Sequence, residues 1–218
     1  HQKRIEKFIR KNNFRLNTFI DVGAFKGKYS DLILKIEKNC KIIMIEPQGK
    51  YFNFLKTKFA NNNRVEVLKM AFSSKKTSLN LKVNKHEITS TFSQFNKANK
   101  YLNLKAILFS SKLENMTKSE EKIEAFPFDE IFEKKKLQYV DLIKIDAEGH
   151  EYEVLIGASN NIQKIDCLLV EFHNDNIYEN YSSKKIHNFL IENNFKLLKR
   201  FNFPFTTWED RLYKNSKL

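Results

Sequence analysis

Four ionisable side chains follow an apolar run in the second half of the chain. Residues 140 to 158 read VDLIKIDAEGHEYEVLIGA, which places Asp146, Glu148, His150 and Glu151 within six residues. A strand buried in a core has no use for so many charges at its end, because burying an unpaired charge is costly. A carboxylate or an imidazole here could instead take a proton from a reacting hydroxyl group, and clustered carboxylates could bind a divalent metal.

A second apolar run, 165 to 173, also contains ionisable residues near its end, Glu171 and His173. Ligands of doubly wound sheets bind at the carboxyl ends of the strands, and neighbouring strands are about 4.8 Å apart. We therefore expect Asp146, Glu171 and His173 to face one cleft. Asp146 is the first choice for orienting or deprotonating the substrate, and the other catalytic candidates are His173, Glu171 and Glu148. A metal ion bridging Asp146, Glu171 and His173 is an additional hypothesis.

Structural roles remain open for several of these residues. Glu148, His150 and Glu151 are expected in the first turn of the next helix, where the helix dipole favours carboxylates. Gly149 would allow the sharp turn that leads into this helix. His173 could equally be a strand-end histidine that is satisfied by its neighbours.

A nucleotide-type turn occurs in the first half of the chain, where residues 21 to 30 read DVGAFKGKYS. Asp21 ends a predicted strand, Gly23 opens the turn, and Gly27 lies where the next helix begins. Glycine suits a tight turn or a close approach to a ligand, and a helix start offers unpaired N–H groups to an anionic ligand group. Nineteen residues after Gly27, Glu46 ends the second strand, where it could accept hydrogen bonds from both ribose hydroxyls.

The dinucleotide fingerprint G-x-G-x-x-G is absent, because Phe25 stands where its second glycine would be. A phenylalanine would crowd a pyrophosphate, which disfavours a nicotinamide-dependent oxidoreductase. We therefore expect a nucleoside ligand without a pyrophosphate. S-adenosylmethionine fits, with its ribose at Glu46 and its amino-acid end over the Gly23 turn.

Apolar runs alternate with helical patterns of about a dozen residues, which is typical of a parallel sheet covered on both faces. The predicted strands are 18–23, 40–47, 64–72, 139–146 and 165–173, followed by an antiparallel pair formed by FKLLKRFNF and TTWEDRLYKN. We expect one domain over residues 1–218, in which 1–16 form an N-terminal helix. Residues 74–126 are interpreted as an insertion that covers the active site and contains a polar helical stretch around 97–121.

The composition narrows the choice of partner and compartment. The net charge is +13, which fits a polyanionic partner or the lysine-rich composition of an AT-rich genome, and the lysines are scattered. No run of 18 apolar residues could span a membrane. Cys40 and Cys167 lie in or beside apolar runs and are interpreted as core thiols of a reducing compartment, so a cytoplasmic protein is expected.

The segments FIDVGAFKGKYS, IEP, FDEIF, VDLIKIDAEGHEYEVLIGA and LLVEFH resemble the FkbM-type S-adenosylmethionine-dependent methyltransferases. The resemblance covers roughly residues 18–73 and 126–175. It implies a class I methyltransferase (Rossmann-like) fold, an α/β structure with a seven-stranded mostly parallel sheet of order 3-2-1-4-5-7-6 and an antiparallel last strand. It also implies methylation of oxygen on sugars, polyketides or related metabolites.

The resemblance assigns cofactor-binding positions in this chain. They are Asp21, Gly23, Ala24 and Gly27 in the loop, Glu46 and Pro47 at the ribose, Ala71, Phe72 and Ser73 near the adenine, and, more loosely, Ser90 and Thr91. Asp146 is expected beside the cofactor as well. Two residues depart from the family pattern: Phe25 replaces a small polar residue, and Ala147 replaces a commoner valine.

We therefore expect an O-methyltransferase that uses S-adenosylmethionine, yields S-adenosylhomocysteine, and acts on a sugar or glycan hydroxyl. The acceptor would belong to a cell-surface polysaccharide or be a nucleotide-linked sugar. An RNA methyltransferase is an alternative, but no basic segment interleaved with aromatic residues supports nucleic acid binding. A non-catalytic nucleoside-binding scaffold is another, and the acidic cluster argues against it. The sequence specifies neither the acceptor nor the oligomeric state.

Overall fold

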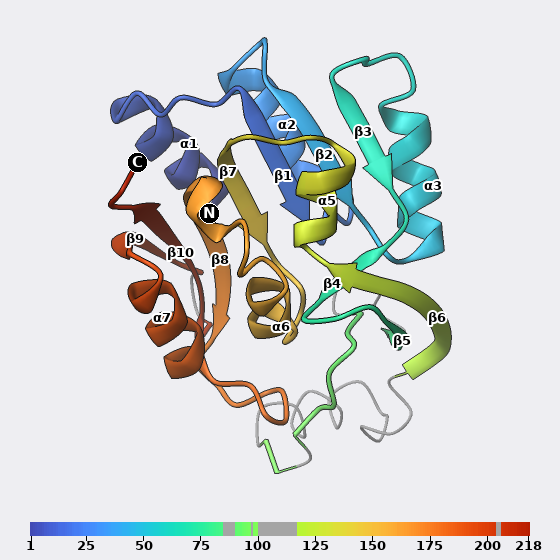
Figure 1. Ribbon diagram of the computed structural model, residues 1–218. Coiled ribbons are helices and arrows are strands. Elements are labelled where there is room, and N and C mark those ends of the chain that lie inside the picture. Colours follow the sequence, from blue (N-terminus) through green and yellow to red (C-terminus); the bar gives the residue numbers. More distant parts are fainter. Residues whose placement is uncertain (85–89, 97, 100–116, 204–205) are drawn as a thin grey trace.

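A seven-stranded sheet forms the centre of the molecule (Figure 1). The computed structural model describes the whole chain except residues 85–89, 97, 100–116 and 204–205. The strand order is β3-β2-β1-β7-β8-β10-β9, which reads 3-2-1-4-5-7-6 when these strands are counted along the chain. The strands are β1 (Thr18–Val22), β2 (Lys41–Ile45), β3 (Val65–Leu68), β7 (Val140–Ile145), β8 (Ile165–His173), β9 (Phe195–Asn202) and β10 (Trp208–Asn215).

Strands β3, β2, β1, β7 and β8 run parallel to one another, and β10 runs antiparallel to both of its neighbours. All parallel strands therefore end at the same edge of the sheet, where ligands of doubly wound folds bind. The expected antiparallel closing pair is β9 and β10, joined to the sheet through β10.

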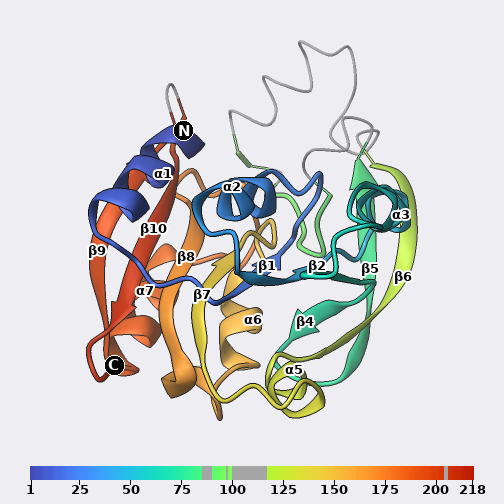
Figure 2. The same ribbon diagram turned by 90° about the horizontal axis from the view of Figure 1, so that it is seen from above.

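Helices cover both faces of this sheet (Figure 2). One face carries α1 (Gln2–Lys11), α2 (Lys28–Ile36) and α3 (Gly49–Lys58), and the other carries α5 (Asp129–Lys134), α6 (Glu151–Ile156) and α7 (Ser183–Glu192). A short 3₁₀ turn, Ile162–Lys164, leads into β8. The predicted N-terminal helix is thus present and ends at Lys11.

The register of the strands explains the two-sided core. Ile20 of β1 lies beside Ile43 and Ile143, and all three pack against α5, α6 and α7. The next residue along each strand points to the opposite face, so Phe19 and Leu142 pack against the first three helices. Strands that bury apolar side chains on both faces account for the continuous apolar runs, each such side chain contributing about 1.5–3 kcal/mol.

The predicted strand 64–72 is in fact two strands. The strand β3 ends at Leu68, and β4 (Ala71–Ser73) leaves the large sheet. A second sheet has the order β4-β6-β5, with β5 at Thr77–Asn84 and β6 at Thr117–Pro127. Met70, part-buried and apolar, continues the hydrophobic pattern through the break, so the sequence gives no sign of it.

The insertion between β3 and β7 therefore contains a small sheet rather than only a polar helix. The helix predicted around 97–121 lies mostly outside the described residues, and from Thr117 the structure has strand β6 instead. Strand β6 pairs in parallel with β4 and antiparallel with β5. The small sheet lies beside the carboxyl ends of β1 and β2 (Figure 1).

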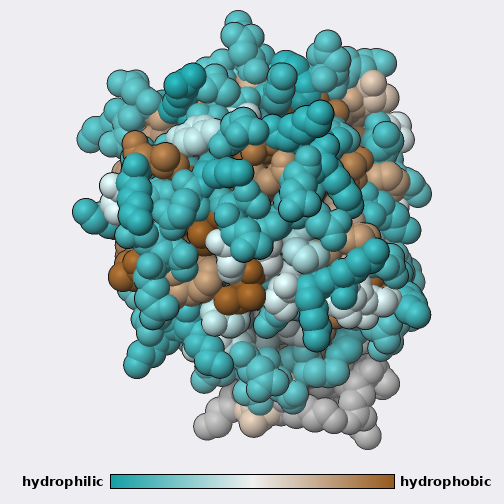
Figure 3. Space-filling model, viewed as in Figure 1, coloured by the Kyte–Doolittle hydropathy of each residue, from teal (hydrophilic) through white to brown (hydrophobic). Residues whose placement is uncertain are grey.

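The two cysteines are buried, and the face drawn in Figure 3 is largely hydrophilic. Cys40 and Cys167 are free and fully buried. The face drawn in Figure 3 is mostly hydrophilic, with small separated apolar patches. Among the described residues, no helix has the length and the apolar character needed to cross a membrane.

Candidate active site

A cavity of about 550 Å³ lies at the carboxyl ends of the parallel strands. Its walls include Gly23 after β1, Glu46 after β2, Asp146 after β7 and Glu171 near the end of β8. This volume is in the range of cavities that hold small ligands and cofactors. The structure thus brings the two sequence motifs, the glycine turn and the acidic strand end, to one place.

Gly23 and Asp146 are in direct contact. The Asp146 N–H donates to the Val22 carbonyl at 3.1 Å, and Gly23 has a φ of +78°. A Cβ atom at Gly23 would lie 1.8 Å from the Asp146 carbonyl oxygen. Only glycine fits here, because any other side chain would overlap the main chain of the acidic strand end.

Glu46 is held by backbone donors at the wall of the cavity. Its Oε2 accepts from the Phe25 N–H at 2.7 Å, and its Oε1 accepts from the Gln48 N–H at 2.9 Å. The residue is 5% exposed. Burial raises the pKa of Glu46 to about 7, although the two N–H donors act in the opposite direction. Each carboxylate oxygen can accept a further hydrogen bond, so the pair of ribose hydroxyls expected from the sequence can be bound.

Phe25, which replaces the usual small polar residue, borders the cavity at the turn after β1. Its φ is +49°, and this conformation directs its N–H to Glu46. The ring packs against Tyr51, with ring centroids 4.2 Å apart. The departure from the family pattern at this position is therefore accommodated by an aromatic pair.

The other predicted cofactor residues divide into two groups. Five more of them line the cavity: Ala24, Pro47, Ala71, Phe72 and Ser90. Four do not line it: Asp21, Gly27, Ser73 and Thr91. Asp21 accepts a hydrogen bond from Ser30, and a Cβ atom at Gly27 would meet the side chains of Leu55 and Met44. For both groups, contact with the cofactor stays a prediction.

Asp146, which is part-buried, forms an ion pair with the buried Lys144, and the sequence reasoning missed this pair. The Lys144 Nζ lies 2.6 Å from Asp146 Oδ2, and Lys144 is 1% exposed. Burial alone would raise the pKa of Asp146, but the Lys144 ammonium outweighs it and holds that pKa below the usual range. Residues two apart on a strand share a face, so the spacing of Lys144 and Asp146 could have revealed this pair.

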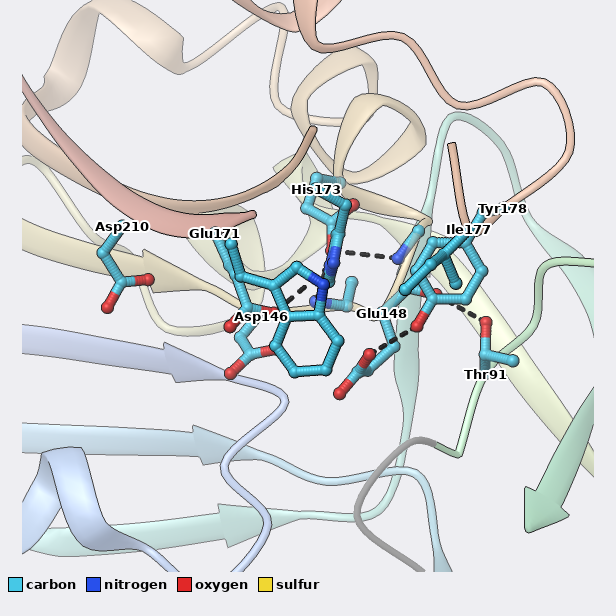
Figure 4. Close-up of polar contacts among 12 residues, drawn as sticks. Thr91, Asp146, Glu148, Glu171, His173, Ile177, Tyr178 and Asp210 are labelled. Carbon is cyan, nitrogen blue, oxygen red and sulfur yellow. Dashed lines mark hydrogen bonds and ion pairs between the residues drawn. The ribbon is translucent and has the colours of Figure 1, made fainter. Parts of the chain in front are cut away.

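Glu148 lies before helix α6, which begins at Glu151, so its predicted place in the first helical turn is wrong. Its φ is +48°, and the Tyr178 hydroxyl donates to its Oε2 (Figure 4). Burial, reinforced by the Asp146 charge, raises the pKa of Glu148 to about 7. Thr91 and Ser93 fix this turn, because their hydroxyls donate to the carbonyls of Glu148 and Gly149.

The capping interpretation fits Glu151 better than Glu148. Its Oε1 accepts from the N–H groups of Ala147 and Gly149, at 2.9 and 3.1 Å. His150 is the residue before the helix, and its Nε2 lies 3.2 Å from Ser73 Oγ. Both residues therefore make contacts that stabilise the turn after β7.

His173 is fully buried beside Glu171. Its Nε2 lies 3.3 Å from Glu171 Oε2, and three aromatic rings meet it edge-on, from Tyr178, Tyr181 and Trp208. Burial lowers the pKa of His173, but the Glu171 carboxylate outweighs this and raises it to about 10. Burial and the Asp146 charge raise the pKa of Glu171 well above its usual value.

A further acidic residue, Asp210 of β10, was not expected from the sequence. The Tyr29 hydroxyl donates to its Oδ2, and His1 Nε2 lies 2.8 Å from the same oxygen. Burial raises the pKa of Asp210 to about 6. No spacing rule links Tyr29 to Asp210, because their contact depends on the pairing of β10 with β8.

A mostly parallel sheet of this order, with a glycine turn after the first strand and an acidic residue after the second at one cavity, is the arrangement expected of a class I methyltransferase. The family model described as the methyltransferase FkbM domain matches residues 21–197, so the chain belongs to this family. The expected dependence on S-adenosylmethionine is confirmed for the family, and the cavity beside Glu46 fits that cofactor.

Known proteins share a short stretch of sequence or the overall fold. Hexuronic acid methyltransferase AglP of Haloferax volcanii is 40% identical over 45 residues, which are 21% of this chain and 19% of that protein. M. capricolum TrmK, solved with S-adenosylhomocysteine, has a TM-score of 0.52 at 11% identity and covers 97% of this chain and 68% of its own. A candidate rRNA methylase of Clostridium thermocellum has a TM-score of 0.55 at 10% identity, covering 98% and 94%. Identities this low show a common fold and nothing further.

Proposed function

We propose that this protein transfers a methyl group from S-adenosylmethionine to a hydroxyl group of a sugar or glycan. The acceptor would be part of a cell-surface polysaccharide or a nucleotide-linked sugar. One observation carries the proposal: the ionised carboxylate of Asp146 borders the cavity that Glu46 also lines, and its main chain touches the Gly23 turn. A proton acceptor therefore lies beside the expected place of the cofactor's amino-acid end.

The chemistry requires a base next to the acceptor oxygen. An alcohol is a poor nucleophile and must lose its proton as the methyl group arrives. The hydroxyl becomes strongly acidic as it gains the methyl group, so a carboxylate with a low pKa can take the proton at that stage. Lys144 keeps Asp146 charged and fixes the position of its Oδ2, so the carboxylate is held at the cavity as a proton acceptor.

The carbohydrate part of the proposal rests on sequence likeness. The 45-residue match to a hexuronic acid methyltransferase supports a sugar acceptor. Structural neighbours named for RNA add no support for RNA, because their identity to this chain is about a tenth. The lysines are scattered along the sequence and form only short runs, which does not favour nucleic acid either.

The test is transfer of a labelled methyl group to a panel of acceptors. The panel contains a hexuronic acid glycan, a neutral hexose glycan, nucleotide-linked sugars and transfer RNA. We expect label in a carbohydrate, in an ether linkage that survives mild base. Label in the RNA alone would refute the proposal.

Two variants locate the chemistry. Asp146→Asn should bind S-adenosylhomocysteine within a few fold of the wild type but lose about 10²–10⁴-fold in turnover, the usual contribution of a positioned base. Asp166→Asn is the matched control, because Asp166 is a buried carboxylate at the opposite end of β8, paired with Lys214. An active Asp146→Asn enzyme would show that another group accepts the proton.

A further inference from the structure

Three ligand atoms meet beside the cavity, which Glu148 and Glu171 line and the buried His173 does not (Figure 4). One oxygen of Glu148, one oxygen of Glu171 and one ring nitrogen of His173 all lie within 4.8 Å of one another. Atoms that bind one metal ion at about 2.0–2.2 Å are separated by up to about 4.4 Å. A closure of a few tenths of an ångström would therefore complete the coordination distances.

The imidazole of His173 has no hydrogen bond to account for its burial. The residue is 1% exposed, and neither Nδ1 nor Nε2 has a hydrogen-bond partner among the described residues. The 3.3 Å approach of Nε2 to Glu171 has the distance of an ion pair but not the direction of a hydrogen bond. A buried polar group without a partner is costly and is usually explained by an ion, a water or a catalytic role.

Aromatic rings fix the direction in which this imidazole points. Tyr178, Tyr181 and Trp208 meet its ring at interplanar angles between 74° and 89°. The Tyr181 hydroxyl accepts from the backbone N–H of His173 and not from its ring. The ring is thus held in place by packing while its nitrogens remain available.

The negative charges around these ligand atoms also favour a bound cation. Three carboxylates, Asp146, Glu148 and Glu171, lie close together and interact electrostatically. Lys144 neutralises Asp146 at 2.6 Å, whereas the Glu148 carboxylate accepts a hydrogen bond from the neutral hydroxyl of Tyr178. A dication between the two glutamates would balance their charges, as buried charges generally require.

From this arrangement we infer that Glu148, Glu171 and His173 form a binding site for one divalent cation of the Mn²⁺ type. The ligand set differs from the one expected from the sequence, because Asp146 is paired through its Oδ2 with Lys144, and Glu148 is the residue that lies close to both Glu171 and His173. Two carboxylates and one imidazole suit Mn²⁺ better than Ca²⁺, which prefers oxygen ligands alone. Glu148 and Glu171 both border the cavity, so an ion held by them would be accessible from it.

A cation here would lower the pKa of a hydroxyl group that approached from the cavity. That catalytic use rests on the proposed function, whereas cation binding itself does not. Binding to His173 requires the neutral imidazole, so the cation would replace the ring proton that Glu171 stabilises.

The experiment is a titration of chelator-treated protein with MnCl₂, followed by calorimetry and by loss of the free Mn²⁺ electron paramagnetic resonance signal. We expect one site per chain. Glu171→Gln and His173→Gln should weaken binding by at least about 100-fold, because even partners outside the coordination shell contribute 10–100-fold. Asp146→Asn should change it far less, which separates this site from the one containing Asp146.

Circular dichroism and S-adenosylhomocysteine binding on the same samples establish that each variant is folded. Folded wild-type protein without saturable Mn²⁺ binding would overturn the inference. Equal binding by Glu171→Gln would overturn it as well, and so would a greater loss in Asp146→Asn than in His173→Gln. None of these readouts needs an acceptor, so failure of the proposed carbohydrate activity would leave the metal result intact.

Discussion

Cofactor affinity should rise with pH through the ionisation of Glu46. Burial raises the pKa of this carboxyl to about 7, although the N–H groups of Phe25 and Gln48 donate to it. Ribose hydroxyls donate hydrogen bonds, and they bind an ionised carboxylate more strongly than a protonated one. Cofactor binding therefore favours the ionised form and releases a proton wherever Glu46 is protonated in the free protein.

The magnitude follows from the pKa. A group with a pKa of about 7 is about 90% ionised at pH 8 and about 10% ionised at pH 6. If only the ionised form binds well, the dissociation constant for S-adenosylhomocysteine should increase about tenfold from pH 8 to pH 6, or about 1.4 kcal/mol. A glutamate with an ordinary pKa of about 4.3 would be ionised throughout and would give no such change.

The assay is calorimetric titration with S-adenosylhomocysteine at pH 6, 7 and 8, in two buffers whose protonation enthalpies differ. The buffers report proton release directly, which should be close to one proton at pH 6 and small at pH 8. Glu46→Gln is the control and should bind more weakly but with little pH dependence from this position. The same tenfold change in Glu46→Gln, or no change in the wild type, would refute the reasoning.

Two further predictions concern the free energy of unfolding. One tests the contact between Gly23 and the Asp146 main chain, and the other tests the ion pair between Lys144 and Asp146. Gly23→Ala should lose at least about 2 kcal/mol in the free energy of unfolding, because it combines a positive φ with overlap of the Asp146 carbonyl. Gly49→Ala, whose Cβ would meet the flexible side-chain ends of Lys69 and Glu121, should stay within about 1 kcal/mol of wild type in the same urea titrations. Lys144→Met should lose about 3 kcal/mol by leaving Asp146 uncompensated, and adding Asp146→Asn should restore part of it. A double variant no more stable than Lys144→Met would contradict the ion-pair explanation.

The sequence predicted the elements that local patterns determine. Apolar runs such as 18–23 and 165–173 identified buried parallel strands. The glycine turn after the first strand and the acidic residues at the strand ends marked the edge where ligands bind. The prediction that Asp146, Glu171 and His173 come together also follows from topology, since neighbouring parallel strands end side by side. The break at Leu68 was missed, because the apolar pattern continues through Met70 into the next strand.

Contacts made by distant segments could not be predicted. Tyr178 follows β8 and reaches Glu148 across the turn after β7, and no spacing in the chain relates the two. The same holds for Tyr29 and Asp210, which meet only because β10 folds back beside β8. The contact between Lys144 and Asp146 could have been predicted, because residues two apart on a strand lie on the same face.

The close packing of Gly23 on the Asp146 carbonyl matters for anyone who wishes to alter this enzyme. Libraries that vary Gly23 will mostly contain chains in which the new side chain collides with the Asp146 main chain. The two segments should be exchanged together when parts are taken from a relative. Substitutions at cavity positions such as Ser90 and Phe92, which belong to the insertion, do not share this constraint. Directed evolution of acceptor preference should therefore begin there.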